Sequence, residues 1–249
     1  MKPYRRRGKT DRIDTEALPE AHRFGGITAV TIRTVDQQQI QQLHRFREQW
    51  KKTRLQRIDG LRGFLRELGY TIPSGVKAVG YQVVGILEED DVPPALNSAL
   101  AGILLEISRL EKAIKLCERD LKLLSEGNGA IERSQGIPGI DLLTSMAMVS
   151  AIGTPHRFSS GRKLASWLGL TPREPSSGNM RQLGRITKQG DVYLRYLLTH
   201  HGARSVFVRA RMEQKAGSPL SALQSWGLSL SGRVGIMRRR VRWQTNWRG

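Results

Sequence analysis

The chain has 249 residues, and 41 Lys and Arg against 22 Asp and Glu give it a formal net charge of +19. This length allows one large core or two smaller ones, and the charge indicates a polyanionic partner, either nucleic acid or an acidic membrane surface. The single cysteine, Cys117, excludes an intramolecular disulfide and fits a reducing compartment. No apolar run approaches the roughly 18 residues of a membrane span, and no apolar stretch follows the basic N-terminus. We therefore expect a soluble cytoplasmic protein with no membrane partner.

The positive charge is concentrated in one part of the chain. From His156 to Gly249 there are eighteen Lys and Arg against three Asp and Glu, whereas from Glu88 to Glu132 there are five against ten. A basic C-terminal third and an acidic middle are typical of a DNA-binding face and a solvated helical spacer.

Residues 1–30 are basic, contain glycine and have no clear periodicity, so they do not indicate a self-contained domain. Asp11 and Asp14 lie three residues apart within Lys9-Thr10-Asp11-Arg12-Ile13-Asp14. On a helix both would share one face and could bind Mg²⁺, the natural metal for phosphate chemistry. The alternative is a surface cluster of ion pairs.

Two long helices are predicted next. The first runs from Val35 to about Leu68 and is stopped by Gly69 and Pro73. The second carries a heptad seam in steps of four and three, closed by Gly127-Asn128-Gly129. Its seam residues are Leu96, Leu100, Ile103, Ile107, Leu110, Ile114, Cys117, Leu121 and Leu124. The pair is interpreted as an antiparallel pair, as a coiled-coil arm that pairs with another subunit, or as a plain hairpin inside a bundle.

A different module follows from residue 134. An apolar helix through Ile152, a short amphipathic helix from Gly161 to Leu168 and a helix from Asp191 to about Arg211 are predicted. The tail from Gly217 has no convincing period.

The turn Ile137-Pro138-Gly139-Ile140 looks like a helix-hairpin-helix element, in which backbone N–H groups near Gly139 would bind a DNA phosphate. Asp141 stands where a second glycine is usual and would repel phosphate. The alternative is an ordinary loop before a buried helix.

The most distinctive segment is Pro172 to Asp191, a loop rich in serine, glycine and arginine. Ser176 and Ser177 lie in it among four cations that would hold a phosphate, namely Arg173, Arg181, Arg185 and Lys188. A serine hydroxyl could attack a phosphodiester while these cations stabilise the developing charge. The alternative is a common flexible Ser-Ser-Gly loop.

Three histidines, His156, His200 and His201, lack partners at metal-ligand spacing, and we interpret them as structural or close to phosphate. Trp243 and Trp247 follow a run of arginines in the tail, which could indicate stacking on bases.

Four blocks of the sequence resemble the DEDD-type insertion-sequence transposases of the IS one-ten / IS eleven-eleven group, relatives of the Piv/MooV DNA invertases. The blocks are KTDRIDTEAL (9–18), GIPGI (136–140), FSSGRKLASWLGLTP (158–172) and SSGNMRQLGRITKQGDVYLR (176–195). With the helices between them the resemblance covers about residues 5–211.

The resemblance implies an RNase H-like domain with four metal-binding acids, a coiled coil and a C-terminal domain with a serine nucleophile. Such transposases form a covalent phosphoserine intermediate, are guided by a structured bridge RNA and assemble as multimers. By position, Asp11 and Asp14 match the last two acids of the tetrad. Ser176 or Ser177 matches the nucleophile, with a slight preference for Ser176.

The sequence departs from the family in three places. The first Asp and the Glu of the tetrad are expected upstream of Met1. Asn179 and Met180 follow the serine loop where many members have glycine and lysine. The peptide from Gly235 to Arg248 matches nothing in the family, but its codons read one base out of step can spell an alanine-rich final helix. A frameshift is therefore our hypothesis for the Trp/Arg tail, and sequencing the gene tests it.

We therefore predict a mainly α protein in four parts: an RNase H-like remnant (1–30), a helical coiled-coil linker (31–130), a compact helical C-terminal domain with the serine loop (131–212), and an irregular tail (213–249). The predicted function is DNA transposition or site-specific recombination with Mg²⁺, a guide RNA, and homo-oligomerisation through the helical arm. The alternatives are an inactive transposase remnant that binds nucleic acid or pairs with an intact transposase, and a basic structural nucleic-acid-binding protein.

Overall fold

The computed structural model describes residues 11–23, 32–72, 76–88, 94–175, 180 and 182–231. Within these ranges the protein is mainly α-helical, as predicted, and an isolated antiparallel bridge joins Pro172 to Ile186. None of the described helices is long and apolar enough to cross a membrane. The serine pair, Arg181 and the Trp/Arg tail lie outside the described residues. The chain divides into two units, 1–34 and 35–249, which are described separately.

The first unit contains helix α1 (Asp11–Arg23), with Pro19 inside it. The two acids expected to bind metal, Asp11 and Asp14, are therefore one turn apart on a helix, as the spacing required. Their side chains are outside the described residues.

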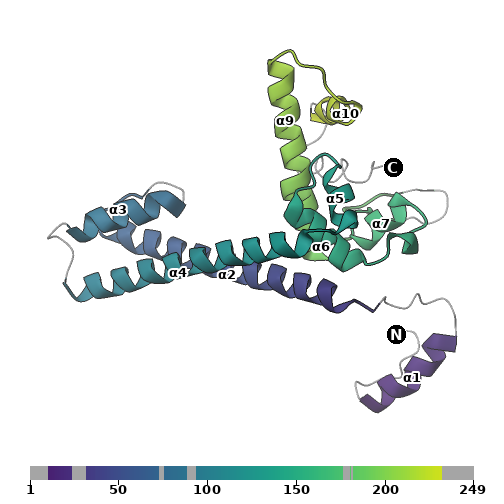
Figure 1. Ribbon diagram of the computed structural model, residues 1–249, viewed down its shortest axis with the longest axis horizontal. Helices are drawn as coiled ribbons and strands as arrows, with labels where there is room; N and C mark the ends of the chain where they lie inside the picture. Colours follow the sequence, from purple (N-terminus) through teal and green to yellow (C-terminus); the bar gives the residue numbers. More distant parts are fainter. Residues whose placement is uncertain are drawn as a thin grey trace. The chain divides into compact units, whose positions relative to one another are not determined.

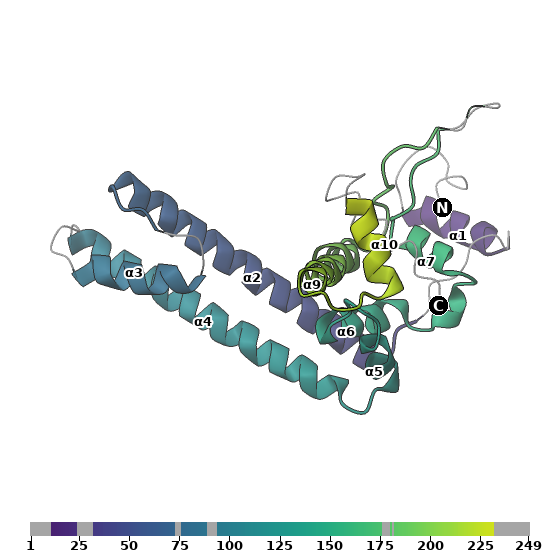
Figure 2. The same cartoon turned by 90° about the horizontal axis from the view of Figure 1, so that it is seen from above.

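The second unit begins with a long arm. Helices α2 (Val35–Glu67) and α4 (Pro94–Ser125) run antiparallel and side by side (Figures 1 and 2). The connection between them contains helix α3 (Val76–Glu88), which packs against both and which the sequence did not predict. Of the three interpretations, an antiparallel pair within one chain is what the structure shows.

Apolar residues close the seam between the helices. From α4, Leu100, Ile107, Ile114, Cys117 and Leu121 are buried, as the heptad predicted, but Leu124 is exposed. On α2, Phe46 and Leu68 are exposed, whereas His44 and Arg47 are buried. His44 and Arg47 are buried because they meet polar side chains of α8 and α4, namely Tyr193 and Glu118.

Ion pairs also link the two long helices. Arg47 lies 2.7 Å from Glu118, Arg54 lies 3.8 Å from Glu111, and Arg57 lies 2.7 Å from Glu106. The residue number falls along α4 as it rises along α2, which fixes the antiparallel register.

The C-terminal part consists of shorter helices: α5 (Gly129–Gln135), α6 (Leu142–Ile152), the 3₁₀ turn η2 (Pro155–Arg157), α7 (Gly161–Trp167), α8 (Val192–Tyr196), the π-helical turn η3 (Leu197–Gly202), α9 (Ala203–Lys215) and α10 (Ala222–Ser231). The predicted helix from Asp191 is confirmed as one rod, α8–η3–α9, that continues four residues beyond Arg211. Asp191 caps its start by accepting a hydrogen bond from the Leu194 N–H.

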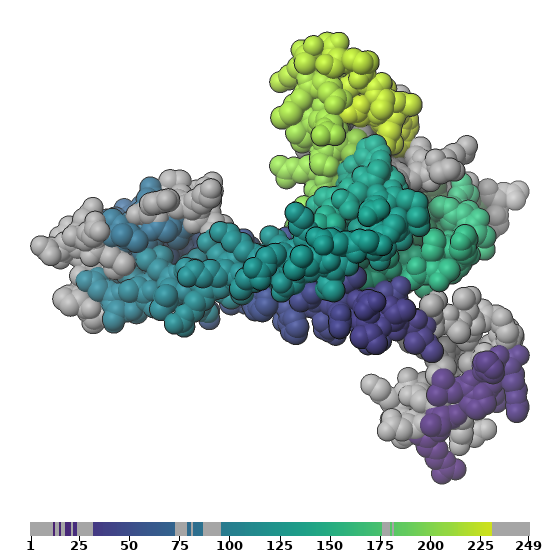
Figure 3. Space-filling model, viewed as in Figure 1, coloured from purple at the N-terminus to yellow at the C-terminus, as the bar shows by residue number. Residues whose placement is uncertain are grey.

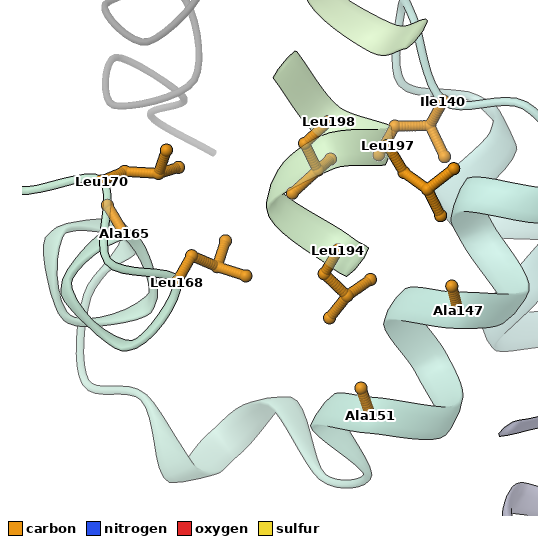
Figure 4. Close-up of a cluster of buried hydrophobic side chains, with 9 residues drawn as sticks. All are labelled: Ile140, Ala147, Ala151, Ala165, Leu168, Leu170, Leu194, Leu197 and Leu198. Carbon is orange, nitrogen blue, oxygen red and sulfur yellow. The ribbon is translucent and has the colours of Figure 1, made fainter. Parts of the chain in front are cut away.

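Helix α6 lies at the centre of this part and is buried along most of its length. It contacts the arm helices α2 and α4 as well as α5 and α8. One core surrounds it on the arm side, formed by Ile40, Cys117, Leu121, Ile131 and Met146. On the other side Ala147 and Ala151 of α6 face Leu194, Leu197 and Leu198 across a second core that also takes in Ala165, Leu168 and Leu170 (Figure 4).

Helix α10 lies against α9 (Figure 3), although the sequence predicted an irregular tail from residue 213. Leu223, Trp226 and Leu230 of α10 form a small core with Ala203, Val206 and Phe207 of α9. These three positions have helical spacing, which the surrounding serine and glycine residues obscured.

Candidate nucleic-acid interface

The predicted serine loop stands on a short hydrogen-bonded base. The Arg173 N–H donates to the Arg185 carbonyl (2.9 Å), and the Gly184 N–H donates to the Arg173 carbonyl (2.7 Å). One step further down, the Thr187 N–H donates to the Thr171 carbonyl (2.9 Å). Residues 171–173 and 184–187 are therefore paired, and the segment with Ser176 and Ser177 joins the two sides of this pairing.

Glycines fix that base to helix α7. Gly169 (φ +69°) and Gly190 (φ +134°) have backbone conformations that L-residues rarely adopt. A Cβ on Gly169 would overlap the backbone of Gln189, and one on Gly190 would overlap the carbonyl of Trp167. Lys188 also has a positive φ, of +56°. The backbone at the two ends of the loop is therefore packed so closely that neither Gly169 nor Gly190 could carry a side chain.

The cations predicted to bind DNA sit on this base. Arg173, Arg185 and Lys188 are exposed, and Arg173 Nη2 lies 3.5 Å from the Thr187 carbonyl. Arg181 lies outside the described residues. Arg195, which the sequence did not single out, donates from Nη1 to the Leu168 carbonyl (3.0 Å) and ties α8 to the end of α7. The described cations therefore lie on both sides of the loop.

A turn with Gly139 lies between α5 and α6, at the place where the sequence predicted a helix-hairpin-helix element. Gly139 has a φ of +89°, and a Cβ there would meet Val206 Cγ2 at 2.6 Å and the Gly202 carbonyl oxygen at 2.7 Å. The glycine is thus required by close packing of the turn on η3 and α9. Asp141 accepts a hydrogen bond from the Thr144 N–H (2.8 Å) and caps α6, which gives this residue a structural role. Phosphate binding near Gly139 stays a prediction.

A buried polar network joins the arm to the C-terminal helices. His44 Nδ1 of α2 lies 3.0 Å from the hydroxyl of Tyr193 on α8, and Arg47 Nε donates to Glu118 on α4 (2.8 Å). Burial, with a smaller contribution from the positive charge of Arg47, lowers the pKa of His44 to about 4. Burial also raises the pKa of Tyr193. His44 is therefore neutral near pH 7, and sequence reasoning missed it because it interrupts an apolar pattern.

The three histidines that the sequence analysis considered lie in the π-helical turn and in η2. The ring of Tyr196 is stacked on His200 at 5.0 Å and meets His201 edge-on at 5.3 Å. His156 lies in η2 and is exposed. In the part of the chain that the structure describes, no three His, Cys, Asp or Glu residues are grouped as metal ligands.

The paired loop base and the packed glycines lie within a segment of the sequence that is similar to a known family. Residues 132–217 match the family described as "Transposase IS116/IS110/IS902 family". This segment, which contains the turn at Gly139 and the serine loop, is therefore similar to that family.

Relatives match beyond this domain. The "Transposase for insertion sequence element IS1111A" of Coxiella burnetii is 34% identical over 220 residues, which are 87% of this chain and 60% of the relative. A "Probable family 20 transposase" of Pseudomonas aeruginosa is 33% identical over 83% of this chain and 62% of its own length. The "Transposase for insertion sequence element IS1328" of Yersinia enterocolitica is 32% identical over 87% of this chain and 64% of its length. The chain thus spans about three fifths of these relatives.

Proposed function

We propose that this chain acts in the transposition of an insertion sequence, cutting and rejoining DNA through a serine nucleophile at Ser176 or Ser177. The observation that carries the proposal is the serine segment itself. It joins two hydrogen-bonded segments that carry Arg173, Arg185 and Lys188, within the part of the chain that matches the transposase family.

The chemistry follows from these residue types. A serine Oγ forms a bond to the DNA phosphorus while the bond from phosphorus to the leaving sugar oxygen breaks, and the serine proton is passed through solvent to that oxygen. The product is a phosphoserine ester, which a DNA hydroxyl can attack in reverse to rejoin the strands. The guanidinium and ammonium groups beside the loop stabilise the negative charge that builds on the phosphate oxygens.

For the metal site, two carboxylates one turn apart on α1 offer the hard oxygen ligands that Mg²⁺ prefers. Bound there, Mg²⁺ would supply positive charge to the phosphate during transfer. Asp11 and Asp14 would hold it through their carboxylate oxygens.

Two partners belong to the same proposal. One is a structured guide RNA, which the basic C-terminal region would hold. The other is a second copy of the chain, because Leu105, Leu116 and Leu123 are exposed on one face of α4 at spacings of eleven and seven residues. The same face supports the second candidate function, a chain without catalysis that binds nucleic acid or pairs with an active transposase.

Covalent trapping tests the proposed chemistry. The full chain is incubated with Mg²⁺ and with DNA carrying the element's junction and the RNA encoded beside it, and the products are run on a denaturing gel. We expect a protein–DNA adduct that disappears in either Ser176→Ala or Ser177→Ala, which identifies the nucleophile. Ser166→Ala, at an exposed serine on α7, is the matched control and should keep the adduct. DNA binding without any adduct would contradict serine catalysis and favour the second candidate.

A further inference from the structure

Helix α8 directly follows the C-terminal side of the serine loop. The Lys188 N–H donates to the Gly169 carbonyl (3.0 Å), and three residues later Asp191 caps the first turn of α8. Between them, Gly190 packs on the carbonyl of Trp167. Because so few residues separate the loop base from the helix, a shift of α8 must also shift the base.

Two polar side chains fasten α8 to different parts of the protein. Arg195 donates from Nη1 to the Leu168 carbonyl (3.0 Å), which ties α8 to the end of α7. The hydroxyl of Tyr193 lies 3.0 Å from His44 Nδ1 on the arm helix α2. Leu194, between them in sequence, is buried in the core beside α6 (Figure 4). The contact with His44 therefore links the loop base to the arm.

This contact is buried and specific. His44 is 3% exposed, and its ring centroid lies 5.5 Å from that of Tyr193, with 56° between the planes. The other ring nitrogen of His44, Nε2, is buried and has no hydrogen-bond partner among the described residues. The ring is thus anchored through Nδ1, and a buried polar group that loses its partner is costly.

Charged groups from several elements surround His44. On α2, Arg47 opposes a positive charge on the ring, and this guanidinium is bound by Glu48 and by Glu118 of α4. Asp141, at the start of α6, favours a charged ring, but less strongly than burial and Arg47 oppose it, and the pKa of His44 is lowered to about 4. On α8, the tyrosine hydroxyl stays uncharged because burial raises its pKa. A proton on His44 would therefore be buried beside a guanidinium.

We propose that Tyr193 is a positioning residue for the serine loop: held by His44, it fixes α8, so that the arm sets where the base of the loop lies. The importance of this base for catalysis rests on the proposed function, whereas the contact itself follows from the geometry alone. Removing the hydroxyl, or charging His44, frees α8 from the arm and loosens the loop base.

Hydrogen exchange in the full chain tests this inference. The reporters are the N–H groups of Gly184, Thr187 and Lys188, each of which donates to a backbone carbonyl at the loop base. Tyr193→Phe keeps the ring and removes the hydroxyl, and we expect it to speed the exchange of these groups roughly tenfold at pH 7, because one buried hydrogen bond is lost. The matched control is Tyr196→Phe, at a ring that is 40% exposed on the same rod, which should leave their exchange unchanged.

Two further measurements separate positioning from a general loss of stability. Leu65→Ala, in the core shared by α2, α3 and α4, should speed exchange in the arm and leave the loop base unchanged. Lowering the pH from 7 to 4.5 should speed exchange at the loop base by roughly tenfold or more after correction for the intrinsic rate, because His44 is protonated more readily once α8 is released. His44→Gln, which does not titrate, should abolish this pH effect.

Equal acceleration of the loop base in Tyr193→Phe and Leu65→Ala, or an unaltered pH effect in His44→Gln, would overturn the proposal. The exchange measurement contains no DNA, so its outcome is independent of the serine chemistry. In the trapping assay, Tyr193→Phe should slow formation of the adduct and leave DNA binding unchanged. If no variant forms an adduct, the proposed function fails, and the exchange rates still decide whether Tyr193 fixes the loop base.

Discussion

The arm and the C-terminal helices are held together in different ways. The arm depends on a repeating apolar seam between two helices of 33 and 32 residues, so its stability is spread over many similar contacts. The C-terminal part depends on single positions where backbone meets backbone, as at Gly139, Gly169 and Gly190. A regular seam tolerates change at most positions, whereas close backbone packing does not. The base of the serine loop and the turn at 138–141 both depend on the second kind of packing.

The largest difference between the regions should appear in their glycines. We expect Gly169→Ala to lower the free energy of unfolding by about 4 kcal/mol, because strain at a positive φ adds to overlap with Gln189. In the arm, a Cβ on Gly63 of α2 meets nothing within 4 Å, so Gly63→Ala should stabilise the helix by about 1 kcal/mol. Urea unfolding followed by circular dichroism measures both. Equal effects at the two sites would contradict the comparison.

A cavity in the arm should have the next largest effect. Leu65 of α2 is fully buried in the core shared with α3 and α4, and Leu65→Ala should cost about 3 kcal/mol in the same measurement. Leu55, on the same helix, is 56% exposed, and Leu55→Ala should change the free energy of unfolding by less than about 0.5 kcal/mol. A loss of similar size at both positions would show that the seam does not hold the arm together.

The contact between His44 of the arm and Tyr193 of the C-terminal part should make the stability of the protein depend on pH. The pKa of His44 is about 4 in the folded chain and about 6.5 when unfolded, so protons favour the unfolded state. Above about pH 6.5 His44 is neutral in both states, and its titration does not lower the free energy of unfolding. As the pH falls from 6.5 toward 4, the free energy of unfolding decreases by up to roughly 3 kcal/mol. Thermal unfolding from pH 7 to pH 4.5 should show this loss. His44→Gln, which does not titrate, should flatten the profile, whereas the same change at exposed His156 should leave it intact. An unaltered profile in His44→Gln would contradict the assignment.

Much of the helical framework was predictable because it follows local rules. The heptad on α4 placed Leu100, Ile107 and Leu121 in the core, and Gly69 and Gly127 marked helix ends correctly, each with a positive φ. Helices α3 and α10 were missed because their short apolar patterns are diluted by glycine and serine. In α10, Leu223, Trp226 and Leu230 form a helix face whose partner is α9, and that contact is tertiary.

The candidate site was predictable in its residue types but not in its arrangement. The loop with Ser176 and Ser177 and its cations could be found from composition and resemblance, and Asp11 and Asp14 from their spacing. The pairing of 171–173 with 184–187 and the roles of Gly190 and Arg195 could not, because they depend on contacts between segments remote in sequence. His44 was overlooked for the same reason, since its partner Tyr193 is 149 residues away.

The sequence by itself therefore determined the mainly helical class, the two long helices and the basic C-terminal third, because periodicity, capping and charge are properties of neighbouring residues. Only the tertiary structure decided that Gly139 packs on Gly202, that Asp141 caps α6, and that Tyr196, Arg204 and the 138–141 turn line one groove. These relations arise where α6 brings the arm, the turn and the α8–η3–α9 rod together. Burial of apolar surface drives this packing, and it depends on contacts between segments that are far apart in the sequence.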